Sequence, residues 1–174
     1  LAATFAAFVT EGPLTGPAGG GFVLLHEPEA STTVLDCFFA VPSGTSGEMD
    51  EVEIDFADAS TQIFHVGEAS VAVPGLMHGL QEAHERRGRL AWEQLFVPAL
   101  ELAARPFPTT EAQAFLHGIL VPILQREPGG TRIYGTVGSI DATALLPALR
   151  LLQQTRAEGV AILLEHLAED IEAY

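Results

Sequence analysis

Apolar and polar residues divide the chain into an early part that favours strands and a longer part that favours helices. Small and aromatic residues over 1–10 predict a buried helix, which ends at 11–13 because glycine and proline do not continue a helix. Residues 15–21 predict a tight loop. The runs 23–25 and 32–39 are apolar at most positions, so they predict a hairpin of strands that are covered on both faces.

Strict alternation of acidic and apolar residues over 51–56 predicts a strand with one wet face. Two further strands are predicted at 62–66 and 69–73. The acidic residues of 48–58 also raise the question of a metal site. Calcium loops need ligands at fixed offsets and a glycine in mid-loop, and the alternation of a half-buried strand explains these residues better.

Helical spacing of apolar residues dominates after residue 75. It predicts helices over 76–87, 91–104 and 110–126, then two more over 141–174 that separate near 157–159. Pro98 and Pro122 are expected to bend or interrupt their helices. A loop is predicted between 129 and 138, where glycines are frequent.

Composition favours one globular domain over residues 1–174, with 48% hydrophobic and 18% charged residues. Acidic residues number 23 against 8 basic ones, which gives a formal charge of −15. Such a chain is unsuited to bind nucleic acid phosphates or an anionic membrane surface. No apolar run is long enough to span a membrane. Residues 1–9 look like the middle of a helix, so we expect further protein upstream, and the sequence favours neither a cytoplasmic nor a periplasmic or extracellular location.

Common catalytic motifs are absent from the sequence. There is no G-x-S-x-G elbow and no H-E-x-x-H, and the six histidines do not group at ligand spacing. His78 and His84 are six residues apart and do not share a helix face, and His65 lies on a predicted strand. Cys37 is the only cysteine; we expect an inert core thiol, which is compatible with a reducing or an oxidising compartment. The glycines of 16–21 lack a following Gly-Lys-Ser/Thr, so close backbone packing explains them better than a phosphate loop.

Several blocks, in order along the chain, resemble the γ-glutamyltranspeptidase family. Residues 14–22 (LTGPAGGGF) are similar to its glycine-rich turn, and residues 35–42 (LDCFFAVP) are similar to its L-D-F-R-E-x-A-P signature. The later blocks are SVAVPGLMHGL at 70–80, RGRLAWEQLFVPA at 87–99, FP at 107–108 and EDIEAY at 169–174. Most of residues 5–130 is covered by the resemblance.

The resemblance implies an α+β protein: the large-subunit part of an N-terminal-nucleophile hydrolase with an αββα sandwich, its strands early and its helices from about residue 75. Such a precursor cleaves itself into two subunits, and the nucleophile is a threonine at the new N-terminus of the small subunit, with its own α-amine as base. Leu1 cannot serve, and Thr15 and Thr109 have no free amine. The resemblance therefore implies no catalytic residue in this chain, no cofactor and no metal. It implies a small subunit as partner, with pairing of two such heterodimers left open.

Phe38 departs from the family signature at the arginine that holds the α-carboxylate of the substrate. Phe38 and its neighbour Phe39 are thus the expected substrate-binding residues. The departure favours an amidohydrolase or acyltransferase with altered acyl specificity. The alternatives are a catalytically silent relative that acts as a structural or binding protein, and an ordinary glutathione-cleaving enzyme. The last would need a shifted register or an arginine from elsewhere, and no arginine precedes Arg86.

Overall fold

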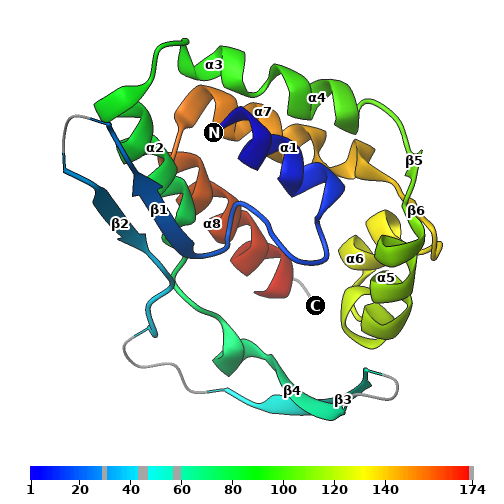
Figure 1. Cartoon of the computed structure of the whole chain (residues 1–174). Helices are drawn as coiled ribbons and strands as arrows, with labels where there is room; N and C mark the ends of the chain where they lie inside the picture. Colours follow the sequence, from blue (N-terminus) through cyan, green and yellow to red (C-terminus); the bar gives the residue numbers. More distant parts are fainter. Residues whose placement is uncertain (29–30, 43–46, 57–59, 173–174) are drawn as a thin grey trace.

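The computed structural model describes residues 1–28, 31–42, 47–56 and 60–172. Its strands come mostly first and its longer helices follow (Figure 1). The helices are α1 (Ala2–Thr10), α2 (Leu76–Arg87), α3 (Trp92–Leu95), α4 (Val97–Ala103), α5 (Glu111–Leu124), α6 (Pro128–Tyr134), α7 (Leu146–Thr155) and α8 (Glu158–Glu172), with 3-10 turns η1 (Glu68–Ser70) and η2 (Ala142–Leu145). The strands are β1 (Gly21–Leu25), β2 (Thr33–Cys37), β3 (Met49–Asp55), β4 (Thr61–Gly67), β5 (Phe107–Pro108) and β6 (Ser139–Ile140).

Helix α1 forms the centre of the core, as its small and aromatic composition predicts. Phe5 is fully buried; its ring stacks on Phe96, with centroids 4.0 Å apart, and meets the edge of Trp92 at 5.2 Å. The Trp92 indole in turn donates a hydrogen bond of 3.1 Å to the carbonyl of Leu152 in α7. Helix α4 packs alongside α1. A cluster of three aromatic side chains thus joins α1 to α3, α4 and α7.

The predicted helix over 91–104 is interrupted, as expected from Pro98. It forms α3 and α4, which meet at Phe96 with Pro98 in the first turn of the second helix. Proline is tolerated there because the first turn has no intrahelical partner for its N–H. Pro122 behaves differently, because α5 continues through it and ends two residues later. The two helices predicted for the C-terminal region are confirmed as α7 and α8.

The hairpin of β1 and β2 is confirmed, but its predicted burial on both faces is wrong. The strands pair antiparallel, with Gly21 opposite Cys37 and Leu25 opposite Thr33, and one face packs on α2. The other face is open, where Phe22 and Leu24 are each 64% exposed and Val34 is 56% exposed. The apolar run was a sound indicator of strands. It did not show that the described residues cover only one of the two faces.

Glycines allow α2 to approach the end of β2. A Cβ at Gly75 would lie 2.6 Å from the carbonyl oxygen of Cys37, and one at Gly79 would lie 2.5 Å from the Cys37 Cβ. Real Cβ atoms do not approach other heavy atoms so closely, so a side chain at either position would force helix and strand apart. The expectation that Cys37 is a core residue is confirmed, because it is 7% exposed.

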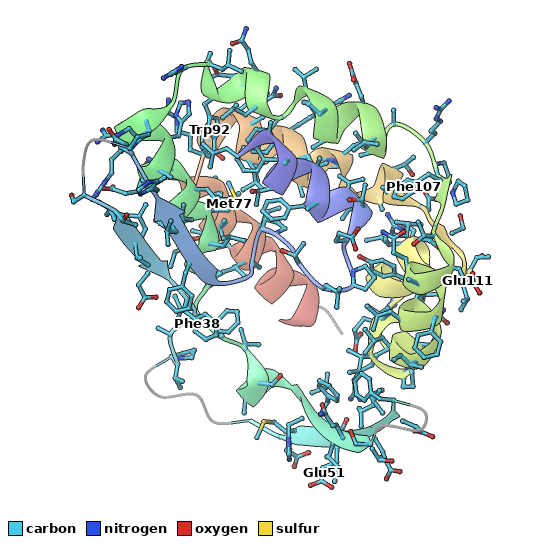
Figure 2. All side chains as sticks on the ribbon, viewed as in Figure 1. Phe38, Glu51, Met77, Trp92, Phe107 and Glu111 are labelled. Carbon is cyan, nitrogen blue, oxygen red and sulfur yellow. The ribbon has the colours of Figure 1, made fainter. Side chains whose placement is uncertain are left out.

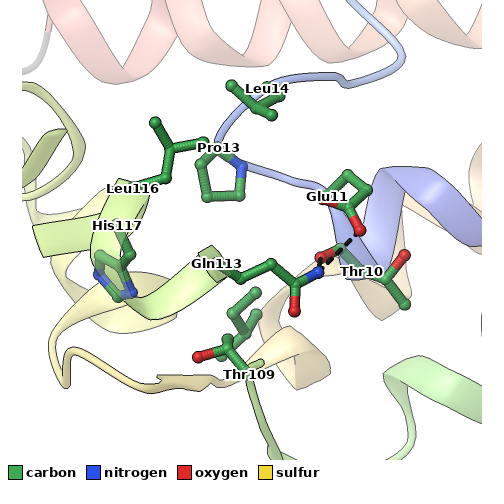
Figure 3. Close-up of a pocket in the computed structure, with 9 residues that line it drawn as sticks. Thr10, Glu11, Pro13, Leu14, Thr109, Gln113, Leu116 and His117 are labelled. Carbon is green, nitrogen blue, oxygen red and sulfur yellow. Dashed lines mark hydrogen bonds between the residues drawn. The ribbon is translucent and has the colours of Figure 1, made fainter. Parts of the chain in front are cut away.

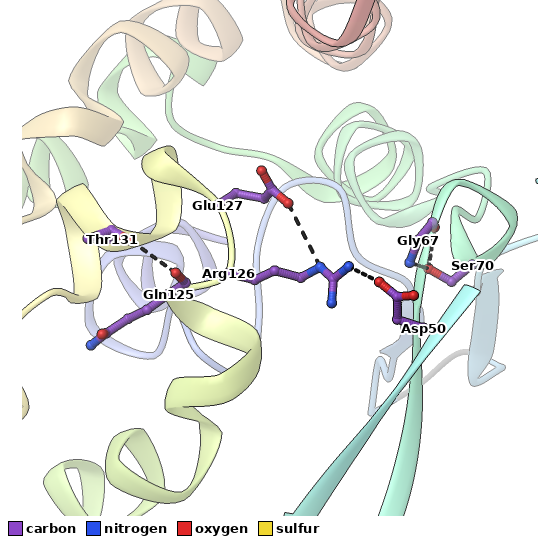
Figure 4. A network of polar contacts seen from close by, with 7 residues as sticks. All are labelled: Asp50, Gly67, Ser70, Gln125, Arg126, Glu127 and Thr131. Atoms are coloured by element: carbon purple, nitrogen blue, oxygen red, sulfur yellow. Dashed lines mark hydrogen bonds and ion pairs between the residues drawn. The ribbon is translucent and has the colours of Figure 1, made fainter. Parts of the chain in front are cut away.

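The alternating segment forms a second hairpin, β3 with β4, set apart from the helical body at the bottom of Figure 1. Ile54 is 1% exposed, while the acidic residues Glu51, Glu53 and Asp55 face solvent, so the predicted half-wet strand is confirmed. Arg126, at the end of α5, forms ion pairs with Asp50 of the hairpin and with Glu127 (Figure 4). Packing of α5 on β3 and this network fix the hairpin to the helices.

The predicted strand over 69–73 is wrong. Residues 68–70 form the turn η1, in which the Ser70 hydroxyl donates to the Gly67 carbonyl at 2.7 Å and accepts from its N–H at 3.1 Å. A serine that bonds to the backbone in this way offers an alternative to strand pairing. Only Val73 pairs, in a single bridge to Ala40.

The predicted loop over 129–138 is wrong for its first half. Pro128 begins α6, which continues to Tyr134 although Gly129 and Gly130 lie in its first turn. Proline at the start of a helix supplies the required backbone angle. Two side chains fix the other end, because His117 and Gln125 both bond to the Tyr134 carbonyl, at 2.8 and 2.7 Å. Tertiary contacts therefore override the glycine signal.

We predict that Gly79→Ala lowers the stability of the complete protein. The added Cβ meets Cys37, and overpacking of this kind costs about 1–3 kcal/mol. Gly118→Ala in α5 is the matched control, because its Cβ would have Val137 as nearest neighbour at 3.9 Å. Alanine is the better helix former, so the control is expected to gain about 0.5–1 kcal/mol. Urea unfolding measures both, and equal stability of the two variants would contradict the close-packing role of Gly79.

Candidate functional site

Phe38 and Phe39 follow β2 directly. Figure 2 shows Phe38 at the lower end of the first hairpin. The ring centroids of Phe38 and Phe39 lie 4.2 Å apart. Phe22 of β1 stacks on Phe38, with centroids 5.7 Å apart and ring planes only 14° apart. Phe38 is 52% exposed and Phe39 is 43% exposed. The two residues predicted to bind substrate are therefore together, and they form with Phe22 a surface that we call the aromatic patch.

Backbone contacts hold the aromatic patch in place from two sides. The bridge between Ala40 and Val73 has hydrogen bonds of 3.1 and 2.9 Å, immediately after Phe39. A Cβ at Gly20 would lie 2.7 Å from the Phe39 nitrogen, and one at Gly75 would lie 2.7 Å from the Phe38 oxygen. These two glycines come from the blocks 14–22 and 70–80, which lie far apart in the sequence. Both blocks thus serve to position the residues after β2.

Asp36 lies beside the aromatic patch and was not predicted from the sequence. It is opposite Phe22 in the strand register, and its Oδ1 accepts a hydrogen bond of 3.1 Å from the Phe38 N–H. The side chain is exposed. Asp36 and Phe38 are two residues apart on an extended chain, so alternation places them on the same face as Phe22. That periodicity was the signal by which Phe22 and Asp36 could have been found.

Among the described residues, four arginines form ion pairs with carboxylates away from Phe38. Arg86 pairs with Glu82 in the same helix, at 2.6 Å, and Arg87 pairs with Glu27. Arg156 lies 3.6 Å from Glu85, and Arg126 belongs to the network of Figure 4. Phe38 thus has two rings and a carboxylate as neighbours and is otherwise exposed, and these four guanidinium groups are engaged by carboxylates elsewhere.

The histidines are the remaining candidates for catalytic or metal-binding chemistry. His65 lies 3.6 Å from Glu51 on the outer hairpin, His84 bonds to the Leu90 carbonyl at 2.8 Å, and His78 is exposed. Buried His117, which bonds to the Tyr134 carbonyl, was not singled out from the sequence. Within the part of the chain that the structure describes, His, Cys, Asp and Glu side chains form no group of three that could hold a metal ion.

A small cavity of about 10 Å³ lies between the end of α1 and the helix α5 (Figure 3). Gln113 crosses its wall and donates to the Thr10 carbonyl at 3.1 Å and to Glu11 at 2.7 Å. Two buried polar atoms among its lining residues, Thr109 Oγ1 and His117 Nδ1, have no hydrogen-bond partner among the residues that the structure describes. A second hollow of about 280 Å³ is lined by Leu1, Ala2, His84, Arg87, Gly88, Arg89, Leu90 and Leu95.

A protein-family model described as gamma-glutamyltranspeptidase matches residues 1–167. The chain belongs to the γ-glutamyltranspeptidase family. A curated relative, the glutathione hydrolase proenzyme of Bacillus subtilis (strain 168), is 34% identical over 113 residues, which are 62% of this chain and 18% of that protein. The acylase ACY 1 proenzyme of Pseudomonas sp. (strain SE83) is 29% identical over 167 residues, 94% of this chain and 29% of that protein. The chain therefore spans less than a third of either curated relative.

The family fold is also found among solved structures. The transpeptidase enzyme CapD of Bacillus anthracis matches 99% of this chain and 58% of its own chain, with a TM-score of 0.73 and 21% sequence identity. The predicted α+β fold is thus confirmed. Within the described residues, no helix is both long and apolar enough to cross a membrane.

We predict that Cys37, next to the aromatic patch of this family member, reacts slowly with iodoacetamide. Burial first, and then the charge of Asp36, raises the pKa of the thiol above its ordinary value of 9.0. The thiolate is the reactive form, so alkylation should accelerate with pH along a curve whose midpoint lies above 9.0. Asp36→Asn should lower that midpoint. Peptide-resolved mass spectrometry follows the reaction, and a midpoint at or below the ordinary value would contradict the prediction.

Proposed function

We propose that the chain is the large-subunit part of a γ-glutamyltranspeptidase-like amidohydrolase or acyltransferase with altered acyl specificity. The single observation that carries this proposal is Phe38, which stands where the family signature has its carboxylate-binding arginine, in a frame that otherwise keeps the family blocks. The aromatic patch supports it, because Phe38 is exposed beside Phe22 and Phe39 rather than buried in the core.

The nucleophile belongs to a small subunit made from the same precursor. Its N-terminal threonine Oγ attacks the substrate carbonyl, and the free α-amine takes the hydroxyl proton. The C–N bond then breaks, the amine leaves with that proton, and the acyl group stays as an ester on the threonine. Water or an acceptor amine attacks the ester and releases the acyl group. The word proenzyme in the names of both curated relatives supports a cleaved precursor.

The small subunit also completes the fold of this chain. The open face of β1 and β2 presents Leu24 and Val34, both more than half exposed, and apolar surface of this kind is stabilised by cover. We assign this aliphatic end of the face to contact with the small subunit. Residues 1–174 then form one domain with that partner, and two such heterodimers can pair.

The role of this chain in the reaction is to hold the acyl group. An arginine that forks onto a carboxylate makes two charge-assisted hydrogen bonds. Loss of one partner of a buried charge pair costs about 2–5 kcal/mol, which is about 30- to 4000-fold in productive binding. Phe38 offers an apolar face in its place, so an acyl group without that carboxylate fits better. The Pseudomonas relative, which matches 94% of this chain, is named as an acylase, and this supports the proposal.

An ordinary glutathione-cleaving enzyme is the second candidate, and the name of the Bacillus subtilis relative favours it. It requires an anchor for the substrate carboxylate other than the residue at position 38. A catalytically silent relative is the third reading, and the residue at the N-terminus of the small subunit decides it. A threonine there is required for the acyl transfer described above.

We predict that Phe38→Arg raises kcat/KM for γ-glutamyl-p-nitroanilide about 30-fold or more in the complete processed protein. The arginine restores a fork of donors for the carboxylate. Phe115→Arg is the matched control, because Phe115 is 59% exposed on α5 and the substitution adds the same charge. The control is expected to leave the rate unchanged.

Release of p-nitroaniline measures both variants. Fast cleavage of the γ-glutamyl substrate by the wild-type protein would favour the glutathione-cleaving enzyme. Absence of turnover with every acyl anilide, in wild type and variants, would favour the silent relative.

A further inference from the structure

Phe22 and Asp36 extend the candidate acyl site beyond Phe38, and their chemistry limits what can bind there. We propose that the aromatic patch takes an uncharged acyl group that carries an aromatic ring, which packs on the stacked rings of Phe22 and Phe38, and that Asp36 is the group that excludes a carboxylate. This inference rests on the proposed function, since it assumes that Phe38 faces the acyl group.

The two rings come from different strands and are held in one arrangement. Phe22 and Phe38 lie in an offset stack with planes 14° apart, and both side chains keep more than half of their surface exposed. The hydrogen bond from the Phe38 N–H to Asp36 and the close contacts of Gly20 and Gly75 fix the backbone that carries Phe38. A third ring can pack on such a preformed surface at a small cost in conformational entropy.

Asp36 sets the charge preference of the same surface. It is opposite Phe22 in the register and two residues before Phe38, so its carboxylate lies beside the two rings on the exposed face. A γ-glutamyl group would bring a second carboxylate to a place that has lost its arginine. The Asp36 carboxylate and the substrate carboxylate would repel each other at short range, and the phenylalanine rings carry no positive charge to offset this repulsion. An uncharged acyl group meets no such repulsion.

The test compares acyl p-nitroanilides with the complete processed protein. The substrates are 4-phenylbutanoyl, hexanoyl and glutaryl anilides, which end in a ring, an aliphatic chain and a carboxylate. We expect kcat/KM to be highest for 4-phenylbutanoyl. Phe22→Leu keeps an apolar residue but removes the ring, and should reduce that value up to about tenfold while leaving hexanoyl within twofold. Phe115→Leu on α5 is the control and should change neither.

Asp36→Asn tests the second part, because asparagine keeps an oxygen that accepts from the Phe38 N–H. It should raise the ratio of kcat/KM for the glutaryl anilide to that for the 4-phenylbutanoyl anilide about two- to fivefold. Equal rates for ring and aliphatic substrates, or a Phe22→Leu effect of the same size on both, would overturn this inference and leave the proposed function intact. Absence of turnover with all three anilides and with γ-glutamyl-p-nitroanilide would overturn both.

A second inference concerns the cavity of Figure 3 and does not depend on the first. His117 is 1% exposed, and its Nε2 lies 2.8 Å from the Tyr134 carbonyl. A carbonyl oxygen only accepts, so Nε2 carries the proton and Nδ1 is left as a buried acceptor. Thr109 Oγ1 is also buried without a partner, and the Gln113 amide is already engaged by Thr10 and Glu11.

We infer that one water molecule binds in this cavity and joins Thr109 Oγ1 to His117 Nδ1. The cavity volume of about 10 Å³ is close to what one water needs, and both polar groups gain the partner that buried groups normally have. The water would donate one hydrogen bond to His117 Nδ1 and form a second one with the Thr109 hydroxyl. It would link β5, through the loop after it, to α5.

A high-resolution crystal structure of the complete protein tests this. We expect density for a water within about 2.7–3.2 Å of both atoms, and its loss in Thr109→Val, which keeps the shape of the side chain. An empty cavity in the wild type would overturn the inference. So would a direct bond between Thr109 Oγ1 and His117 Nδ1, since the two groups would then satisfy each other.

Discussion

The close approach of α2 to the end of β2 is the contact on which the candidate site depends. Two glycines make it, since a Cβ at Gly75 or at Gly79 would lie within about 2.6 Å of Cys37 atoms. Because helix and strand are in backbone contact, the chain after Cys37 has little freedom. A third glycine, Gly20, limits it from the other side. The position of Phe38 is therefore fixed by residues that carry no side chain.

This arrangement separates the position of the candidate site from its chemistry. The glycines and the Ala40–Val73 bridge set where residue 38 lies, whatever its side chain. The side chain itself is more than half exposed and contributes little to the core. A phenylalanine in place of an arginine at such a position would alter charge and shape without disturbing the packing that holds it. The altered specificity that we propose is the physical consequence expected of that separation.

Much of the fold was predictable from the sequence because local patterns and packing agree. Alternation over 51–56 gave the outer hairpin, and helical spacing gave α2, α5, α7 and α8. The predictions failed where one short-range signal was opposed by another. At 69–73, strand formers were outweighed by the bonds of Ser70, and at 129–134 the glycines were outweighed by Pro128 and by the bonds to Tyr134. The family blocks located Phe38, but Phe22 and Asp36 required the strand register.

The open face of the first hairpin explains why the sequence was misleading about burial there. Phe22, Leu24 and Val34 have the composition of a covered strand, and the described residues cover only the opposite face. Sequence patterns record the environment of a residue in the whole protein, whereas exposure in one chain records only what that chain supplies. The aliphatic end of this face, Leu24 and Val34, is suited to a protein interface. The aromatic end is better suited to a ligand, because burial of the Asp36 carboxylate in a closed apolar contact would be costly. Beside a bound ligand, the same carboxylate can select by charge. The acyl site that we propose lies where these two parts of the face meet.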